Sequence, residues 1–485
     1  MTGLVPSATA IELPELRLDA TYYDTDDLRL ARSGITLRRR DGEPGPAWTV
    51  KLPFDVGGPV LARREIRFDG PVGEVPDAAA DLVLASARTR DLEPVAHLTT
   101  IRRPIEIRDL DGRLLAEVVD DMVSVSGGRC PAGRFREVEI ELRDPGDRSR
   151  QILDAAVLRF VAAGCITGSP MPKVIRALGK PATRPPDLVA TPLAPDATLV
   201  GVVRHAVASS VAQIIRHDPG VRLGGDPEDV HHLRVGARRL RSDLRSFAPL
   251  LGRDQIAQLR AELGWLGTVV GAVRDHDVLA AQLAAHIASL PEVDAPAGAQ
   301  LMRRLEDEAE DARAAMLGAL RGNRYLGLLE ALVHFAPELQ VAEVPGLSFR
   351  SDAQLASNIA RKPWRRLAEA VDALGPDPSD AELHQVRILA KRCRYAAEAV
   401  APIVGPAASR FAAAVAEVQT VLGDHQDTVV AESWLRHAAA AVRSSGLAAG
   451  QLVALERSQR SELRAQWLDI WRAASSKKLR HWLRG

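Results

Sequence analysis

Two stretches of basic residues organise the chain. The first, VHHLRVGARRLRSDLRSF, spans Val230–Phe247, and the second, LHQVRILAKRCRYAAEAV, spans Leu383–Val400. On a helix, residues spaced by three, four or seven share one face. In the first stretch that face carries a histidine followed by arginines, namely His231, Arg234, Arg238, Arg241 and Arg245. In the second stretch it carries His384, Arg387, Lys391 and Arg394. The sequence therefore predicts two helices, each with a row of cations spaced ~5 Å per turn.

Such a row of cations has two interpretations. On a single helix it is typical of a solvated face that binds nothing. Here, two copies occur at an offset of 153 residues, and few acidic residues lie inside either copy. The repetition favours an anion-binding surface over a solvated face.

The composition limits the classes of protein to consider. A chain of 485 residues with 46% hydrophobic residues is long enough for two or three globular domains. The formal net charge is zero and only 4% of the residues are aromatic, so nucleic-acid binding through bulk charge or base stacking is not supported. Any anion site must come from local clustering of cations.

The cysteines and apolar segments indicate a compartment. Cys130, Cys165 and Cys393 are scattered, which fits neither a disulfide framework nor a zinc site and is typical of a reducing environment. No apolar run approaches ~20 residues, and the start MTGLVPSATAIELPEL does not have the pattern of a signal peptide. We expect a cytoplasmic protein with no membrane partner.

Residues 1–180 consist of short alternating segments separated by Asp-Gly or Pro-Gly pairs, the pattern of β-strands. The expected strands are Gly34–Arg40, Trp48–Leu52, Arg63–Phe68, Ile101–Ile107, Leu114–Val119 and Phe135–Leu142. Asp111-Gly112 predicts a hairpin. Helices are expected at Asp77–Ser86 and Ser149–Ala163.

Four of these strands each have one face of charged residues and threonines. The residues on these faces include Thr36, Arg38, Arg40, Thr49, Lys51, Arg63, Glu65, Arg67, Glu137, Glu139 and Glu141. A sheet with one solvated face would show this pattern. A closed barrel with a charged interior would show it too, with cations gripping an anion and the glutamate row holding a divalent metal. The pattern leaves both interpretations open.

The order of motifs resembles the CYTH, or triphosphate tunnel metalloenzyme, superfamily. The resemblance covers about residues 11–180. Its motifs are Tyr22-Tyr23-Asp24-Thr25, Leu30, Gly34–Arg40, the Lys51 strand, Arg63 with Glu65, Arg102-Arg103, Arg136–Leu142 and Lys173.

The resemblance implies an eight-stranded antiparallel barrel that hydrolyses triphosphates or related compounds with Mg²⁺ or Mn²⁺. It implies triphosphate binding by Arg38, Arg40, Lys51, Arg63, Arg103 and Lys173. It implies metal binding by Glu65, Glu137, Glu139 and Glu141. In such a site the metal neutralises developing charge while fixed cations orient the phosphate chain.

The chain departs from the family pattern at its start. The family's first strand carries E-x-E-x-K, which supplies metal ligands and a lysine, and no such motif precedes Tyr22. We therefore expect an N-terminally incomplete domain over residues 1–180, either because the natural chain begins earlier or because the strand is lost. Because of this departure, we expect phosphate binding rather than metal-dependent catalysis as the main function.

A Pro- and Ala-rich linker is expected at 181–196, followed by an all-α domain at 197–485 in which the hydrophobic period changes to 3.6. About ten helices are expected, with breaks at Asp218-Pro219-Gly220 and Gly375-Pro376-Asp377. The domain repeats internally, over about 197–345 and 350–485. Two such bundles could merge their basic helices into one groove.

The helical half closely resembles the CHAD family, over about residues 197–485. The matching motifs are H-x-x-R-x-x-x-[RK]-R-x-R in both repeats, Gly271–Val278 and Leu422–Asp427. The resemblance implies binding of inorganic polyphosphate without a cofactor, and arginine, lysine and histidine suit a linear polyanion. The expected binding residues are Arg204, His231, Arg234, Arg238, Arg241, Arg245, Lys362, Arg366, His384, Arg387, Lys391 and Arg394. A polyphosphate ligand also implies association with polyphosphate granules.

Three functions follow from the sequence. The first is polyphosphate binding by the helical domain, with an accessory or vestigial barrel. The second is a metal-dependent triphosphatase or polyphosphate hydrolase, and the third is a scaffold whose basic groove receives an acidic protein. No P-loop, dinucleotide-binding or nucleophile motif and no H-E-x-x-H pattern occurs. The absence of E-x-E-x-K favours the first function over the second.

Overall fold

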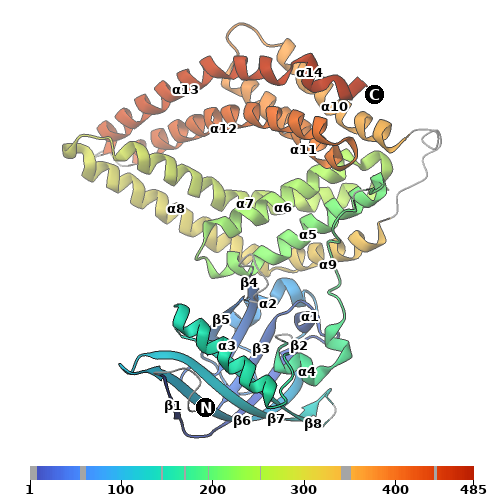
Figure 1. The fold of residues 1–485 in the computed structure, drawn as a ribbon. Coiled ribbons are helices and arrows are strands. Elements are labelled where there is room, and N and C mark those ends of the chain that lie inside the picture. The colour runs from blue at the N-terminus through green and yellow to red at the C-terminus, as the bar shows by residue number, and fades with distance from the viewer. Residues whose placement is uncertain are drawn as a thin grey trace. The chain divides into compact units, whose positions relative to one another are not determined.

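The computed structural model describes residues 8–54, 62–130, 132–143, 146–168, 171–194, 196–251, 253–339, 351–441 and 445–484. It divides into two compact units, Met1–Asp187 and Leu188–Gly485. The first is an antiparallel sheet with short helices, and the second is helical (Figure 1). The expected class, an α+β unit followed by an all-α unit, is confirmed.

The first unit is built on one curled sheet in the order β5-β4-β3-β2-β6-β7-β8, with β1 pairing to β6. The strands are β1 (Ala8–Glu12), β2 (Leu16–Asp24), β3 (Thr36–Asp41), β4 (Trp48–Phe54), β5 (Ala62–Phe68), β6 (Glu93–Asp109), β7 (Leu114–Gly128) and β8 (Gly133–Leu142). Among the described residues no pairing joins β5 to β8. The sheet is therefore an open half-barrel rather than the closed tunnel that the sequence allows.

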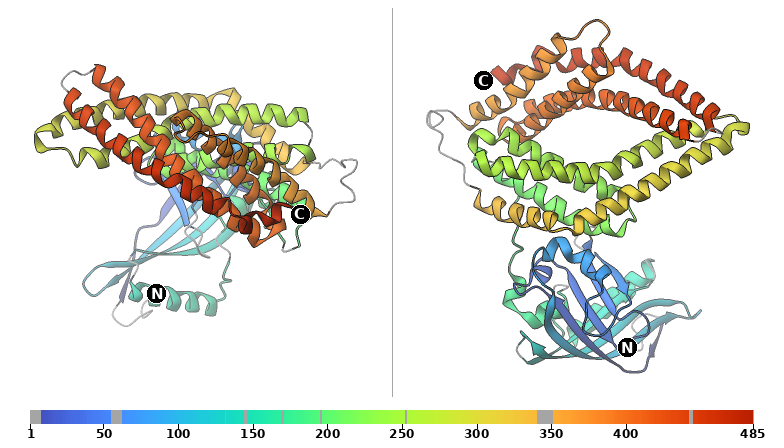
Figure 2. Two further views of the ribbon diagram at one scale, coloured as in Figure 1. Left: turned by 90° about the horizontal axis from the view of Figure 1, so that it is seen from above. Right: turned by 180° about the vertical axis from the view of Figure 1, so that it is seen from behind.

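The predicted hairpin is confirmed between β6 and β7. Gly112 has φ 81°, a conformation that glycine adopts without strain, and its N–H donates to the Asp109 carbonyl over 3.1 Å. The two strands then pair along their length. This long ribbon forms one side of the curl (Figures 1 and 2).

Two short helices were expected and both are present. They are α2 (Asp77–Ala87) and α3 (Asp147–Ala162). The unit also contains two shorter helices, α1 (Arg29–Arg32) and α4 (Lys173–Leu178). The side chains of Val174, Ile175 and Leu178 on α4 are buried in one apolar cluster with residues of β2, β6 and β7. Helix α4 therefore packs on the inner face of the sheet.

The first part of the expected linker belongs to the first unit. Ala182, in the 3-10 helix η1 (Lys180–Thr183), is buried in the same apolar cluster as α4. The Asp187 carboxylate pairs with Arg32 over 2.6 Å and also with Arg88. These contacts fix the chain as far as Asp187 onto the sheet unit.

The second unit consists of two successive groups of helices. The first group is α5 (Leu199–Leu223), α6 (Pro227–Ser246), α7 (Arg253–Ile287), α8 (Ala295–Arg321) and α9 (Asn323–Glu338), with 3-10 turns η2 (Ala248–Leu250) and η3 (Glu292–Asp294). The second is α10 (Asp352–Asp372), α11 (Asp380–Val404), α12 (Pro406–Ala441), α13 (Gly446–Ala474), α14 (Lys477–Arg480) and η5 (His481–Arg484). The first group lies within the first expected repeat, about 197–345, and the second within the other, about 350–485.

The expected helix break at Asp218-Pro219-Gly220 is wrong. These residues lie inside α5, which ends before Gly224. The Asp218 carboxylate is buried and accepts hydrogen bonds from Arg222 over 2.6 Å and from Tyr325 over 2.8 Å. These core contacts stabilise α5 as a continuous helix across Pro219. The other expected break, at 375–377, does separate α10 from α11.

The two groups of helices meet at one end through an apolar core. Leu279, Leu283 and Leu305 of the first group pack with Leu435 and Leu452 of the second. The buried Glu456 carboxylate adds polar bonds to Gln282 over 2.6 Å and to His286 over 2.9 Å. Within the described chain, no helix combines the length and apolarity needed to cross a membrane.

Candidate anion-binding sites

The strand pairing brings charged side chains together on the inner face of the sheet. Arg38 lies opposite Tyr22 and Thr49, and Lys51 lies opposite Glu65. Because alternate residues of a strand share a face, the pairing extends this surface across the sheet. The charged residues that it places on the inner face include Arg38, Arg40, Lys51, Arg63, Glu65, Arg102, Asp121, Glu137 and Glu139.

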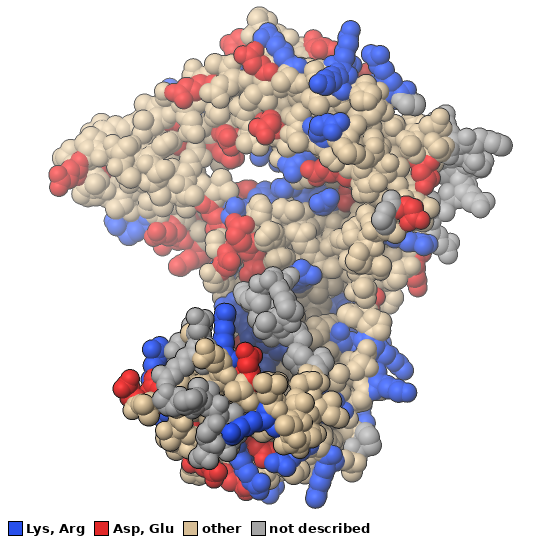
Figure 3. Space-filling view, in the orientation of Figure 1, with Lys and Arg blue, Asp and Glu red and all other residues tan. Residues whose placement is uncertain are grey.

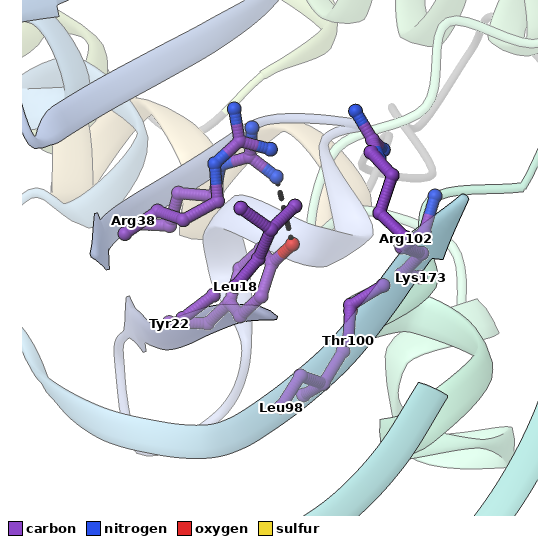
Figure 4. A pocket seen from close by; sticks show the side chains of 9 residues that line it. Leu18, Tyr22, Arg38, Leu98, Thr100, Arg102 and Lys173 are labelled. Atoms are coloured by element: carbon purple, nitrogen blue, oxygen red, sulfur yellow. Dashed lines mark hydrogen bonds between the residues drawn. The ribbon is translucent and has the colours of Figure 1, made fainter. Parts of the chain in front are cut away.

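A small pocket lies at the centre of this face (Figure 4). It is lined by Leu18, Ala20, Tyr22, Arg38, Arg40, Leu98, Thr100, Arg102 and Lys173. Arg38 is 8% exposed, and its Nη1 donates to the Tyr22 hydroxyl over 3.2 Å. Its Nε has no partner among the described residues. A buried guanidinium that lines a pocket and leaves one donor without a partner favours an anion there.

Arg102, rather than Arg103, lies on the inner face. The Arg103 guanidinium is on the opposite face, where its Nε pairs with Glu15 over 2.9 Å in solvent. Arg102 lines the pocket and makes two hydrogen bonds to the buried Asp121 carboxylate, of 2.9 and 2.8 Å. The sequence pattern chose the wrong member of the pair because a shift of one residue along a strand moves a side chain to the other face.

Lys173 enters the pocket from α4 and is surrounded by carboxylates. Its Nζ lies 3.1 Å from Asp121, 2.6 Å from Glu137 and 2.7 Å from Glu139. Burial alone would lower the pKa of Lys173, but Glu139 and the other carboxylates raise it above its usual value. The ammonium is therefore charged at neutral pH.

The residues expected to hold Mg²⁺ or Mn²⁺ do not fit that role in this arrangement. Divalent cations need several open carboxylate oxygens. Glu65 is paired with Lys51 over 2.8 Å, and Glu141 with Arg143 over 3.1 Å. Glu137 and Glu139 are paired with Lys173, and no group of three metal-ligating side chains suited to an ion occurs in the described part of the chain.

The charge state of Glu65 agrees with this pairing. Burial opposes ionisation of its carboxyl, but the hydrogen bond and charge of Lys51, with Arg38 and Arg67 nearby, lower its pKa to about 2. Arg63, the other predicted residue of β5, has its pKa lowered by burial. On strands β4 and β5, Lys51 is therefore already paired with Glu65, and Arg63 is partly buried.

The two basic helices of the second unit contribute to a shared cluster, here called the central cluster: Arg234 and Arg238 of α6, and Arg387 and Lys391 of α11. Arg238 Nε donates to the Tyr395 hydroxyl of α11 over 2.9 Å. Burial, followed by the charges of the three arginines, lowers the pKa of Lys391 to about 7. The structure thus brings the two predicted rows of cations together.

Two aspartates accompany the central cluster in a repeated arrangement. Asp275 pairs with Arg234 over 2.9 Å, and Asp427 lies near Arg387. Burial raises the pKa of Asp427 despite the nearby Arg387. Gly271 lies against Arg234 in the first repeat and Gly423 against Arg387 in the second. Gly271 and Gly423, which belong to the two matching family motifs, therefore make room for equivalent arginines.

A second group, here called the arginine cluster, lies along the same helices. It consists of Arg241 and Arg245 of α6, Arg260 of α7, Arg366 of α10 and Arg392 of α11. Burial and four neighbouring arginines lower the pKa of Arg245 to about 10. No salt bridge to any of the five is found among the described side chains, and Arg260 Nε is buried without a partner.

The remaining predicted residues have other surroundings. Arg204 donates to the Leu339 carbonyl over 3.2 Å, and Arg394 pairs with Glu398 over 2.7 Å. Lys362 is exposed on α10. His231 lies near Arg274 and His384 near Arg387, and burial followed by these charges lowers the pKa of both histidines. Both are therefore neutral at pH 7.

Sequence reasoning missed three cations: Arg102, Arg260 and Arg392. Arg392 was visible as part of the repeated K-R-x-R motif, but its position in the helix does not belong to the chosen face. Arg260 comes from α7, and only the packing of α7 beside α6 brings it to the cluster. No spacing within one helix could reveal that proximity.

An opening separates the two groups of helices beyond the end at which they meet. In Figure 1 it lies between the pair α6 and α7 and the pair α11 and α12, and in Figure 3 lysine and arginine side chains line part of its rim. The two basic helices α6 and α11 therefore border a solvent-accessible space. This geometry suits an elongated anion.

Comparison with known protein families agrees with the two-unit fold, and two solved structures are similar to part of the chain. A CYTH domain model matches residues 7–154 and a CHAD domain model matches residues 205–436. PptA from Streptomyces chartreusis is 24% identical, with a TM-score of 0.47 over 57% of this chain and 100% of that chain. The CHAD domain from the plant Ricinus communis is 29% identical, with a TM-score of 0.44 over 61% of this chain and 95% of that chain.

Two protein sequences from Mycobacterium tuberculosis are similar over nearly the whole chain. They are Rv2226 of strain ATCC 25618 / H37Rv and MT2285 of strain CDC 1551 / Oshkosh. Each is 32% identical over 462 residues, which cover 92% of this chain and 86% of the relative. The chain therefore carries a CYTH domain followed by a CHAD domain and belongs to the same family as these two proteins.

Proposed function

We propose that the helical unit binds inorganic polyphosphate along α6 and α11. The observation that carries this proposal is the arginine cluster, in which five guanidinium groups lie together without a carboxylate partner among the described residues. Like charges held close together in a partly buried site repel one another unless an anion joins them. The cluster therefore calls for a ligand with several negative charges.

The shape of the site favours a linear ligand. From Arg234 to Arg245, α6 advances about 16 Å at ~1.5 Å per residue. The central cluster lies at one end of this segment and the arginine cluster at the other. Arginine forks hydrogen-bond phosphate oxygens in pairs, so a chain of phosphates matches successive turns.

An equilibrium binding assay tests the proposal. Long-chain polyphosphate is titrated into the native chain and into the double variant Arg245→Ala/Arg392→Ala. Loss of two charge-assisted contacts, at ~1.5–3 kcal/mol each, should weaken binding about 100-fold or more. The matched control is Arg304→Ala/Arg472→Ala, which removes two arginines that form ion pairs within their own helices, one half-buried and one exposed.

The control variant should bind polyphosphate like the native chain. Equal losses in both variants would contradict the proposal, because they would show binding to diffuse charge. Displacement by polyglutamate at matched charge would favour the alternative of a scaffold for acidic proteins. Tagged protein that fails to localise to polyphosphate granules in cells would count against the expected location.

A second candidate function belongs to the sheet unit. The unused Nε of buried Arg38, beside Arg102 and Arg40, supports binding of a short phosphate chain in the pocket. Hydrolysis of triphosphate with Mg²⁺ or Mn²⁺ would also need open carboxylates, which the ion pairs to Lys51, Arg143 and Lys173 do not leave. Phosphate release from tripolyphosphate, with and without these metals, measures this alternative directly.

A further inference from the structure

The environment of Lys173 resembles that of a bound cation. Its Nζ is within 3.1 Å of oxygens from three carboxylates, those of Asp121, Glu137 and Glu139. The Lys173 side chain is 12% exposed and Asp121 is fully buried. The ammonium donates a hydrogen bond to Glu139 and holds Asp121 and Glu137 through charge at ion-pair distance, since Glu137 Oε1 has no hydrogen-bond partner among the described side chains.

The charges around these three carboxylates are balanced without a metal. Arg102 pairs with Asp121 over 2.8 Å, and Arg176 pairs with Glu137 over 3.1 Å. With Lys173 they supply three positive charges for three negative ones. A divalent cation added to this group would meet an ammonium at its centre and would have to displace it.

Helix α4 holds the ammonium in place. Lys173 is its first residue, and the following Val174, Ile175 and Leu178 are buried against the sheet. Withdrawal of Lys173 would therefore require α4 to leave its apolar cluster or the side chain to abandon all three carboxylates. Either change costs buried contacts.

We propose that Lys173 takes the place of a divalent metal in the sheet unit, so that the pocket binds a short phosphate chain without Mg²⁺ or Mn²⁺. Lys173 then holds the carboxylates and does not itself grip the phosphate, which corrects the role implied by the family resemblance. Phosphate contacts come from Arg38, with its unused Nε, and from Arg40, whose ion pair with Glu43 a bound phosphate would replace. The inference does not depend on polyphosphate binding by the helical unit.

The first test measures Mn²⁺ binding to the whole chain in phosphate-free buffer. Mn²⁺ binding by the native chain should be the same with and without the substitutions Glu137→Gln/Glu139→Gln. Lys173→Met removes the charge at similar length and should create one Mn²⁺ site, which the same two glutamine substitutions abolish. A glutamate-dependent Mn²⁺ site in the native chain, or none in a folded Lys173→Met variant, would overturn the inference.

Thermal unfolding provides a second readout, because the Tm reports the stability that the Lys173 ion pairs contribute. Lys173→Met leaves three carboxylates with fewer partners, so the Tm of the sheet unit should fall by about 5 °C. Saturating Mn²⁺ should restore the Tm of this variant and leave that of the native chain unchanged. Stabilisation of the native chain by Mn²⁺, lost on Glu137→Gln/Glu139→Gln, would contradict the proposal.

A third experiment keeps Lys173 unchanged, so that it remains informative if the Lys173 variants do not fold. Tripolyphosphate is titrated into the Arg245→Ala/Arg392→Ala chain, in which the helical site is weakened, with EDTA or with Mg²⁺. The affinity should be the same in both and should fall at least tenfold on Arg38→Met. Binding that disappears in EDTA would overturn the inference, whereas failure of polyphosphate binding by the helical unit would not affect this experiment.

Discussion

The sheet unit and the helical unit both gather arginine and lysine side chains, but they neutralise them differently. In the sheet, Lys51, Arg102 and Lys173 each have a carboxylate within 3.1 Å. In the helical unit, the arginine cluster has no ion pair among the described residues. The first surface is therefore largely neutralised by its own carboxylates, whereas no described carboxylate neutralises the arginine cluster.

Reversing charge in the central cluster should give the largest effect. Arg234→Glu/Arg387→Glu places two negative charges where a polyanion must pass, so polyphosphate binding should fall by about 1,000-fold or more. Arg38→Met/Arg40→Met in the sheet should change it less than threefold. Equal losses, measured by equilibrium titration, would show that the sheet is the main site and would break the comparison.

A buried arginine of the helical unit that is already paired should affect stability instead. Arg222 lies in the core with Asp218, 2.6 Å away, and also donates to the Leu320 carbonyl over 3.0 Å. Arg222→Met leaves Asp218 without its cation and should lower the free energy of unfolding by ~3–5 kcal/mol, as measured in urea. Polyphosphate binding by the folded variant should be unchanged, and a specific loss of binding would contradict the distinction between paired and ligand-binding arginines.

The pH dependence of binding sharpens the comparison further. Lys391 has a pKa of about 7 in the free protein, so it loses its charge as the pH rises through 7. A bound polyanion favours the charged form, so binding takes up a proton and should weaken up to about tenfold per unit between pH 7 and 8.5.

Lys391→Arg is the control for this titration, because arginine stays charged across the range. The variant should remove most of the slope. His231 and His384 titrate below their usual range and contribute little above pH 7. A native chain with a flat profile would show that Lys391 is already charged or does not meet the ligand.

The smallest effect is expected from the acids beside the central cluster. Asp275→Asn/Asp427→Asn frees Arg234 and Arg387 from neighbouring negative charge, so polyphosphate should bind about threefold more tightly. Weaker binding would instead mean that the aspartates orient the two arginines for the ligand. Titrations at one ionic strength separate these outcomes.

The sequence alone predicts much of the fold because its local periodicities are strong. The alternation in Gly34–Arg40 and the 3.6-residue period in Val230–Phe247 each place side chains on one face of an element. The repeat of the basic helix also predicts that two similar surfaces exist. These features depend on neighbours within one strand or helix, which a sequence displays directly.

What the sequence does not predict depends on packing between elements. The choice of Arg102 over Arg103 is set by strand register, and the continuation of α5 through Pro219 is set by the buried Asp218. The partners of Lys173 come from β7 and β8, far from it in the chain. Arg260 joins Arg245 only because α7 packs beside α6.

Arginine footprinting tests the central claim most directly. The whole chain is treated with phenylglyoxal with and without long-chain polyphosphate, and modified peptides are quantified by mass spectrometry. We expect protection of Arg245, Arg366 and Arg392, with no change at the exposed control Arg472. Protection of Arg40 without protection of these three residues would contradict the account and place the polyphosphate on the sheet.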